Sequence, residues 1–291
     1  MRPIFEEMIS FPGLGYLSHF PNLLFLAEVL ALLWLAKRAF GFFCPYDLEE
    51  QLVRHDNKAV TLNFVGYLAG VALIVEGVLE SPSPSLAWGL ISVAIWGLVG
   101  IMLLLVAGRL NDRFILRGIN AHQAMLKEGN LAVAVVEGAS YLGSAALIRA
   151  IVMGESLGWA MDLGLTLFYF VLGQLAFWLY ALLYQKLTSY DDLAEIAAGN
   201  AAAGLTLGAN LAAMGFLMAM PLKQSYSLPW FVAWFVLGNA TLAAFRWAMD
   251  RLVISSEKLD QEIYRDKNWG VAILEGAFSV SAVLILQNLF G

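Results

Sequence analysis

The chain has 291 residues, of which 60% are hydrophobic and 14% are charged, and its formal net charge is −6. Soluble globular proteins are about 45–50% apolar and about 25% charged, so this composition excludes an ordinary soluble domain and predicts an integral membrane protein. The single cysteine, Cys44, excludes an internal disulfide and a cysteine-based metal site.

The predicted elements, in chain order, are an N-terminal segment and a series of membrane spans. Residues 1–21 lack the basic start and the short apolar stretch of a signal peptide, so we expect an interfacial segment there. A spanning helix needs about 20 mainly apolar residues, and the stretches that meet this need predict an all-α bundle of about eight transmembrane helices. The expected spans are 22–43, 59–79, 86–108, 131–153, 158–185, 200–222, 228–249 and 269–290.

The connections between these spans alternate in length and charge. Those after the odd-numbered spans are long and polar, and we expect short surface helices within 47–56 and 119–128. Of the 17 Lys and Arg residues, only Arg2, Arg149 and Lys223 lie away from these long connections. By the positive-inside rule, we expect the long connections in the cytoplasm of a bacterial cell and both termini outside the inner membrane.

An internal duplication divides the chain into two repeats. A shift of 138 positions matches Asp112, Asn130, Glu137 and Gly138 to Asp250, Asn268, Glu275 and Gly276. The match predicts four-helix repeats at 22–153 and 158–291 that cross the membrane in the same direction, related by a pseudo-two-fold axis along its normal. The second and sixth spans align either with a shift of 138, which superposes Gly66 on Gly204, or with one of 143, which superposes Asn57 on Asn200.

An asparagine opens each even-numbered span. These residues are Asn57, Asn130, Asn200 and Asn268. Asparagine is a good helix N-cap, so we expect each to cap the span that follows. The alternative is that several positive helix ends converge on one vestibule and attract an anion.

The chain resembles a known family in these features. Tandem four-span units with starts such as Asn-Leu-Ala-Val at 130–133 and Asn-Ala-Ala-Ala at 200–203, and with glycine-marked even spans, are similar to domain of unknown function 350. That family is an uncharacterised group of bacterial inner-membrane proteins. The resemblance covers most of the chain and is best in 112–150 and 250–290. It implies location and architecture, and it supplies no catalytic or binding residues.

Glycines recur in the even-numbered spans, where small residues permit close helix approach in lipid. We expect these glycines to pack helices, within one chain or between chains. They are Gly66, Gly70, Gly138, Gly204, Gly208 and Gly276.

Two intramembrane carboxylates occupy equivalent positions in the repeats. Glu137 and Glu275 each lie seven residues beyond their asparagine, which is roughly 10 Å along the helix. A charge at that depth costs about 2.5–3.5 kcal/mol and by default indicates function, so the pair is a candidate path for a cation or proton. The alternative is structural pairing, of Glu137 with Lys37 and of Glu275 with Arg246.

A second charged group occurs toward the other end of the spans in the first repeat. It comprises Glu28, Glu76 and Arg149, and pairing of Arg149 with either carboxylate would offset part of its desolvation cost. The second repeat lacks this group, since Arg149 matches Gln287 and Glu28 matches Leu172. We therefore expect the two repeats to contribute unequally.

The chain carries no nucleotide-binding loop, hydrolase elbow or zinc motif, so we expect no enzyme, cofactor or metal site. Basic and acidic residues alternate, which argues against nucleic-acid binding. The lipid bilayer is the expected partner, and self-association is left open. The pattern favours a transporter or channel for a small solute, a cation or proton. The alternative is a scaffold or accessory subunit that transports nothing.

Overall fold

The computed structural model describes residues 22–254 and 257–290. These residues form eight long helices and no strand, which confirms the predicted all-α membrane bundle; the expectation for 1–21 lies outside the described residues. The long helices are α2 (Leu23–Phe43), α3 (Lys58–Glu80), α4 (Leu86–Phe114), α6 (Leu131–Val152), α7 (Trp159–Leu187), α9 (Ala201–Ala219), α10 (Leu228–Ala248) and α12 (Trp269–Phe290).

Seven of these helices are long and apolar enough to span a membrane by themselves. The exception is α2, whose 21 residues include Glu28, Lys37 and Arg38. Lys37 and Arg38 lie in the last two turns of α2, where long basic side chains reach the membrane surface while their stems stay in the apolar layer.

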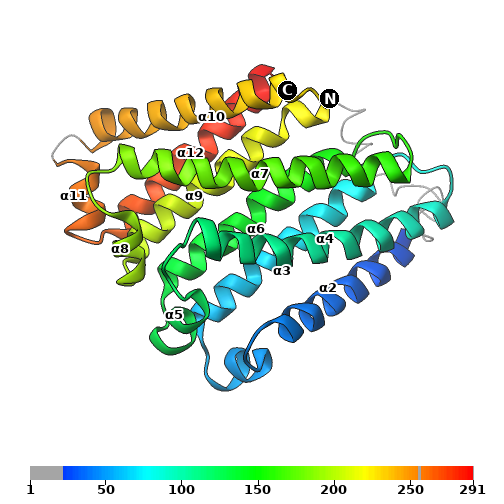
Figure 1. Ribbon diagram of the computed structural model, residues 1–291, viewed down its shortest axis with the longest axis horizontal. Helices are drawn as coiled ribbons and strands as arrows, with labels where there is room; N and C mark the ends of the chain where they lie inside the picture. Colours follow the sequence, from blue (N-terminus) through cyan, green and yellow to red (C-terminus); the bar gives the residue numbers. More distant parts are fainter. Residues whose placement is uncertain (1–21, 255–256, 291) are drawn as a thin grey trace, which may run out of the picture.

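Each long connection contains a short helix. These are η2 (Glu50–Arg54), α5 (Ala121–Glu128), α8 (Asp192–Ala197) and α11 (Leu259–Tyr264). They lie at one end of the molecule, which we call the short-helix end, and the residues nearest both chain termini lie at the other (Figure 1). Two further short turns, η3 (Pro221–Lys223) and η4 (Met249–Val253), follow α9 and α10.

The backbone repeats four times, more finely than the two predicted repeats. In each of four helix pairs, a long helix leads into a short helix, then a left-handed residue, then the asparagine that starts the next long helix. The left-handed residues are Asp56, Gly129, Gly199 and Lys267, with φ of 45°, 60°, 80° and 50°. This conformation is the usual glycine or asparagine stop of a helix, and it turns the chain back toward the membrane.

The long helices form two layers. In one, α3, α6, α9 and α12 stand side by side in a row, with extensive contacts of α6 to α3 and α9 and of α9 to α12 (Figure 1). In the other, α4 packs on α3 and α6, α7 on α6 and α9, and α10 on α9 and α12, while α2 packs on α3 and α4.

The row corrects the predicted pseudo-two-fold axis. Under two-fold symmetry, the contact of α6 with α9 would be matched by one of α12 with α3, yet those helices lie at opposite ends of the row (Figure 1). The contact of α6 with α9 instead resembles that of α3 with α6. The repeats therefore associate head to tail, an arrangement that does not close.

Glycines bring the helices of the row together. A Cβ on Gly66 would overlap the backbone of Gly138, and one on Gly215 would overlap the backbone of Gly143. Farther along the row, Gly276 packs against Ala209. Gly66 of α3 has the same place in its contact with Gly138 as Ala209 of α9 has in its contact with Gly276. The shift of 143, which superposes residue 66 on residue 209, is therefore the correct alignment of α3 with α9.

We predict an asymmetric response to alanine at the contact of α3 with α6. A Cβ on Gly138 has only ordinary contacts, 3.4 Å from the Leu62 carbonyl oxygen and 3.6 Å from the Gly66 Cα. Gly66→Ala should therefore destabilise the protein by about 1–3 kcal/mol, as overpacking does, and Gly138→Ala should not. Thermal unfolding in detergent measures both, and equal losses would contradict this packing.

Candidate functional site

The four asparagines cap the helices of the row. The Asn57 Oδ1 accepts hydrogen bonds from the Ala59 and Val60 amides at 3.1 Å each. The Oδ1 atoms of Asn130, Asn200 and Asn268 accept in the same way from amides two or three residues ahead. The helix N-termini are thus satisfied locally, and they are distributed along the row rather than gathered around one vestibule (Figure 1).

Three of these asparagines also connect successive helix pairs. Asn57 Nδ2 donates to the Met125 carbonyl in α5 at 3.0 Å, Asn130 Nδ2 to the Ile196 carbonyl in α8 at 2.8 Å, and Asn200 Nδ2 to the Ile263 carbonyl in α11 at 2.9 Å. The side chains of the three acceptor residues are fully buried. Each asparagine therefore satisfies an end carbonyl of the short helix in the next pair. We call this contact the inter-pair hydrogen bond.

In the second repeat, Glu275 has a built-in counter-ion. Arg246 of α10 donates from Nη1 to the Glu275 carboxylate and from Nη2 to Asp260 at 2.6 Å. Tyr184 and Asn210 donate to the same Glu275 oxygen at 3.3 and 3.2 Å. Glu275 is 1% exposed, so this network keeps a buried carboxylate balanced by a guanidinium.

In the first repeat, Glu137 is equally buried, at 2% exposure, but no basic side chain of the described residues pairs with it. Asn63 Nδ2 donates to its Oε2 at 2.5 Å, and the neighbouring charged group is a second acid, Asp112 of α4. Among the described residues no Lys, Arg or His forms an ion pair with Glu137 or Asp112. Lys37, the partner in the alternative of structural pairing, binds instead to the exposed Glu49 at 3.2 Å.

The difference between the repeats comes from two substituted positions. The residue equivalent to Arg246 is Gly108, and a Cβ there would overlap the hydroxyl of Tyr141. The residue equivalent to Tyr141 is Ser279, which donates to Asn210 Oδ1 at 3.0 Å. A tyrosine in the first repeat thus lies over the backbone position from which an arginine extends in the second.

Several polar groups around Glu137 are buried without a hydrogen-bond partner among the described residues. They are Glu137 Oε1, Asp112 Oδ1, Asn63 Oδ1, Tyr67 OH and Tyr46 OH. Native structures leave few such atoms, and a group of them requires an explanation, such as a bound water or ion. The corresponding region of the second repeat leaves Glu275 Oε2, Tyr190 OH and Asp192 Oδ1.

Asp192 lies at the start of α8, outside the spans. Burial raises its pKa from 3.8 to about 6, although the hydroxyl of Thr188, which donates to it at 2.6 Å, acts in the opposite direction. The folded protein thus favours the protonated form, so this group stabilises the fold most below about pH 4, and that contribution is lost as the pH rises through about 6.

Arg149 forms a separate ion-pair group at the other end of the first repeat. It binds Glu76 through two nitrogens and Glu80 through Nη2 at 2.8 Å. Glu28, the other expected partner, lies apart from it, with Oε2 buried and without a hydrogen bond in the described residues. Glu76 and Glu80 are about half exposed, so this group joins α3 to α6 near the membrane surface.

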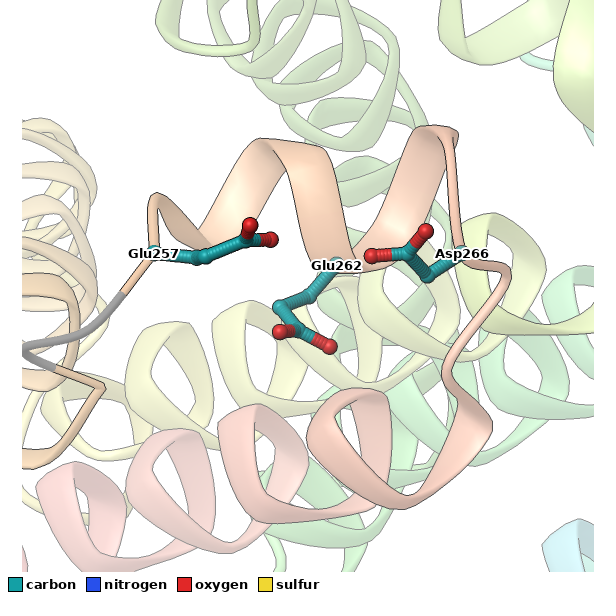
Figure 2. Close-up of side chains that lie close together, drawn as sticks. All are labelled: Glu257, Glu262 and Asp266. Atoms are coloured by element: carbon teal, nitrogen blue, oxygen red, sulfur yellow. The ribbon is translucent and has the colours of Figure 1, made fainter.

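Three carboxylates gather around α11, where their ligand atoms lie within 4.8 Å of one another (Figure 2). Arg265 pairs with Glu257 at 2.6 Å and with Asp266 at 2.9 Å, and Asn268 donates to Glu262 at 2.9 Å. The cluster is explained by these contacts, and we assign no metal ion to it.

Sequence reasoning missed three members of the first-repeat site, namely Asn63, Asp112 and Tyr141. The match of Asp112 to Asp250 between the two repeats could have indicated Asp112. Asn63 carried no signal, because the asparagine that binds the second carboxylate, Asn210, is four residues away from the position equivalent to it in α9.

The comparisons with known proteins agree with this architecture. The family model described as Domain of Unknown Function (DUF350) matches residues 15–152 and again 158–290. The chain belongs to the DUF350 family. It is also 24% identical, over 273 residues, to the UPF0719 transmembrane protein of Aquifex aeolicus (strain VF5), covering 89% of this chain and 97% of that protein. No solved structure matches. This DUF350 protein is therefore a multi-pass membrane protein of an uncharacterised family.

We predict opposite effects of the same substitution in the two repeats. Glu275→Gln removes a partner from a buried ion pair and should lower the free energy of unfolding by about 3 kcal/mol. Glu137→Gln should leave stability unchanged or raise it, because the amide still accepts from Asn63 and can donate to Asp112. Thermal unfolding in detergent compares them. A larger loss from Glu137→Gln would show that Glu137 has a counter-ion after all.

Proposed function

We propose that this DUF350 protein transports or conducts a proton or a small monovalent cation, and that the exchangeable site is in the first repeat. One observation carries the proposal: the buried Glu137 lies beside the half-buried Asp112 with no Lys, Arg or His of the described residues paired to either, whereas a fixed arginine balances the equivalent Glu275. A fully buried carboxylate beside a second carboxylate is stable only with a proton or another cation to balance it.

The contrast between the repeats supports an ion rather than a larger solute. A single charged side chain, Arg246, balances Glu275 in the second repeat. Around Glu137 the available ligands are carboxylate, amide and hydroxyl oxygens, which suit a proton or a hard cation. A path through both Glu137 and Glu275 does not fit this arrangement, because Arg246 already pairs with Glu275 and α9 lies between α6 and α12.

A flux assay tests this function. Liposomes that contain the purified protein and a pH-sensitive dye should take up or release protons when a membrane potential is imposed. This proton movement should occur either without other ions or only when Na⁺ or K⁺ is present. Glu137→Gln and Asp112→Asn should abolish that flux. Glu128→Gln, which changes an exposed acid at the end of α5, is the control and should retain it.

A paired substitution makes the test sharper. Gly108→Arg combined with Tyr141→Ser recreates in the first repeat the arginine and serine of the second. We expect this variant to fold as stably as the wild type, since the introduced guanidinium would balance Glu137, and to show no flux. If its flux equals that of the wild type, the Glu137 site is not on the path.

The alternative is a scaffold that transports nothing. It is favoured by one observation, that Glu137 does not line any of five cavities on the described residues, which lie around α2 and at the two ends of the row. Wild-type protein that carries no proton, Na⁺ or K⁺ flux under any imposed gradient would favour this reading.

We also propose that the short-helix end lies on the cytoplasmic side of the bacterial inner membrane, because the basic residues concentrate there. In a Cys44→Ser background, Val53→Cys in η2, whose side chain is 75% exposed, should resist a membrane-impermeant thiol reagent in intact cells. Ser83→Cys, in the connection at the other end, should react. The reverse labelling would invert the orientation.

A further inference from the structure

The row of helices has two ends, and each end presents half of an interface that the chain itself uses internally. Inside the chain, α6 packs on α9 through Ala132 against Gly204, Ala139 against Gly208 and Gly143 against Gly215. Those contacts define which positions on a helix of the row face the next helix. The same positions can then be located on α12 and on α3, where the row stops.

The face of α12 that corresponds to this contact is exposed. The equivalents of Ala132, Ala139 and Gly143 are Gly270, Ala277 and Ser281, and all three are exposed, while Ala272, Glu275 and Ser279 on the other side of α12 are buried. Small residues at such spacing allow close helix approach in lipid. A helix that only faced lipid would have no need of them.

At the other end of the row, α3 presents the complementary face. The shift of 143 makes Val65 the equivalent of Gly208 and Ala72 the equivalent of Gly215. Both side chains are exposed. Since α3, α6, α9 and α12 all begin at the short-helix end, a second copy in the same membrane orientation can place its α3 beside α12 in the register that α9 adopts beside α6.

The inter-pair hydrogen bond gives an independent indication. Three of the four asparagines donate to a carbonyl in the next short helix, but within 22–254 and 257–290 the only acceptor of Asn268 Nδ2 is Glu262, in its own pair. The residue equivalent to the acceptors Met125, Ile196 and Ile263 is Leu52 of η2, five residues before Asn57, as Met125 is before Asn130. Leu52 is only partly buried, whereas the three acceptor residues are fully buried.

We propose that α12 of one chain binds α3 of a second copy of this chain, head to tail, continuing the row from chain to chain. In this contact Ser281 lies against Ala72, Ala277 lies against Val65, and Asn268 donates to the Leu52 carbonyl of the next copy. The contact is heterologous, so it forms a ring or an open file rather than a two-fold dimer. It is independent of the proposed transport function.

Cysteine cross-linking in native membranes tests the proposal, in a Cys44→Ser background. One chain carrying both Ala72→Cys and Ser281→Cys should give a ladder of dimers, trimers and higher species after mild oxidation. Chains with Ala72→Cys alone or Ser281→Cys alone should stay monomeric, and mixing these two should give only a dimer. Val280→Cys in place of Ser281→Cys is the matched control at the same depth and should give no ladder.

A second measurement does not depend on cysteine chemistry. The particle mass in lipid nanodiscs should correspond to two or more chains for the wild type and to one chain for Ala277→Leu with Ser281→Leu. Both substituted side chains are exposed in the single chain, so this variant should keep the wild-type melting temperature. Dimers from Ser281→Cys alone would establish a two-fold contact and overturn the proposal, as would a wild-type mass of one chain.

Discussion

The close backbone approach of neighbouring helices in the row is the constraint on which the rest of the structure depends. Lipid gives helices no hydrophobic reason to associate, so packing at short distance and hydrogen bonding must hold them together. Gly66 against Gly138 and Gly215 against Gly143 allow this distance. Once the row is that tight, the short helices come within hydrogen-bonding reach of the preceding asparagines, and Glu137 and Glu275 are sealed between helices of the two layers.

The two repeats share this frame but balance their buried carboxylates differently. The second repeat fixes a guanidinium beside Glu275 and adds Asp260 to it. In the first repeat the position of Asp260 is taken by His122, whose Nδ1 has no partner among the described residues, and the arginine position is Gly108. A carboxylate with a fixed counter-ion cannot exchange it, which is why the exchangeable site proposed above is in the first repeat.

Much of the fold could be predicted from the sequence because hydropathy and helix capping act locally. The eight long helices begin and end within a few residues of the expected spans, apart from α4, which extends to Phe114. What failed depended on the relation between helices. Depth along the span offers Lys37 as an alternative partner of Glu137, yet its side chain pairs with Glu49 of the next connection. Depth and periodicity do not show in which direction around a helix a side chain points, or which helices are neighbours. For the same reason the predicted pseudo-two-fold axis was wrong.

An open row of repeats has a different meaning in lipid than in water. Soluble repeat proteins need polar capping repeats, because an uncovered apolar end would aggregate. In a bilayer an apolar end is already solvated by lipid and requires no cap, so apolarity alone carries no information about association. The informative feature is instead the residue size on the exposed face. On α12 that face retains Gly270, Ala277 and Ser281, the small residues that serve helix contact elsewhere in the row, although no helix of the described chain covers them.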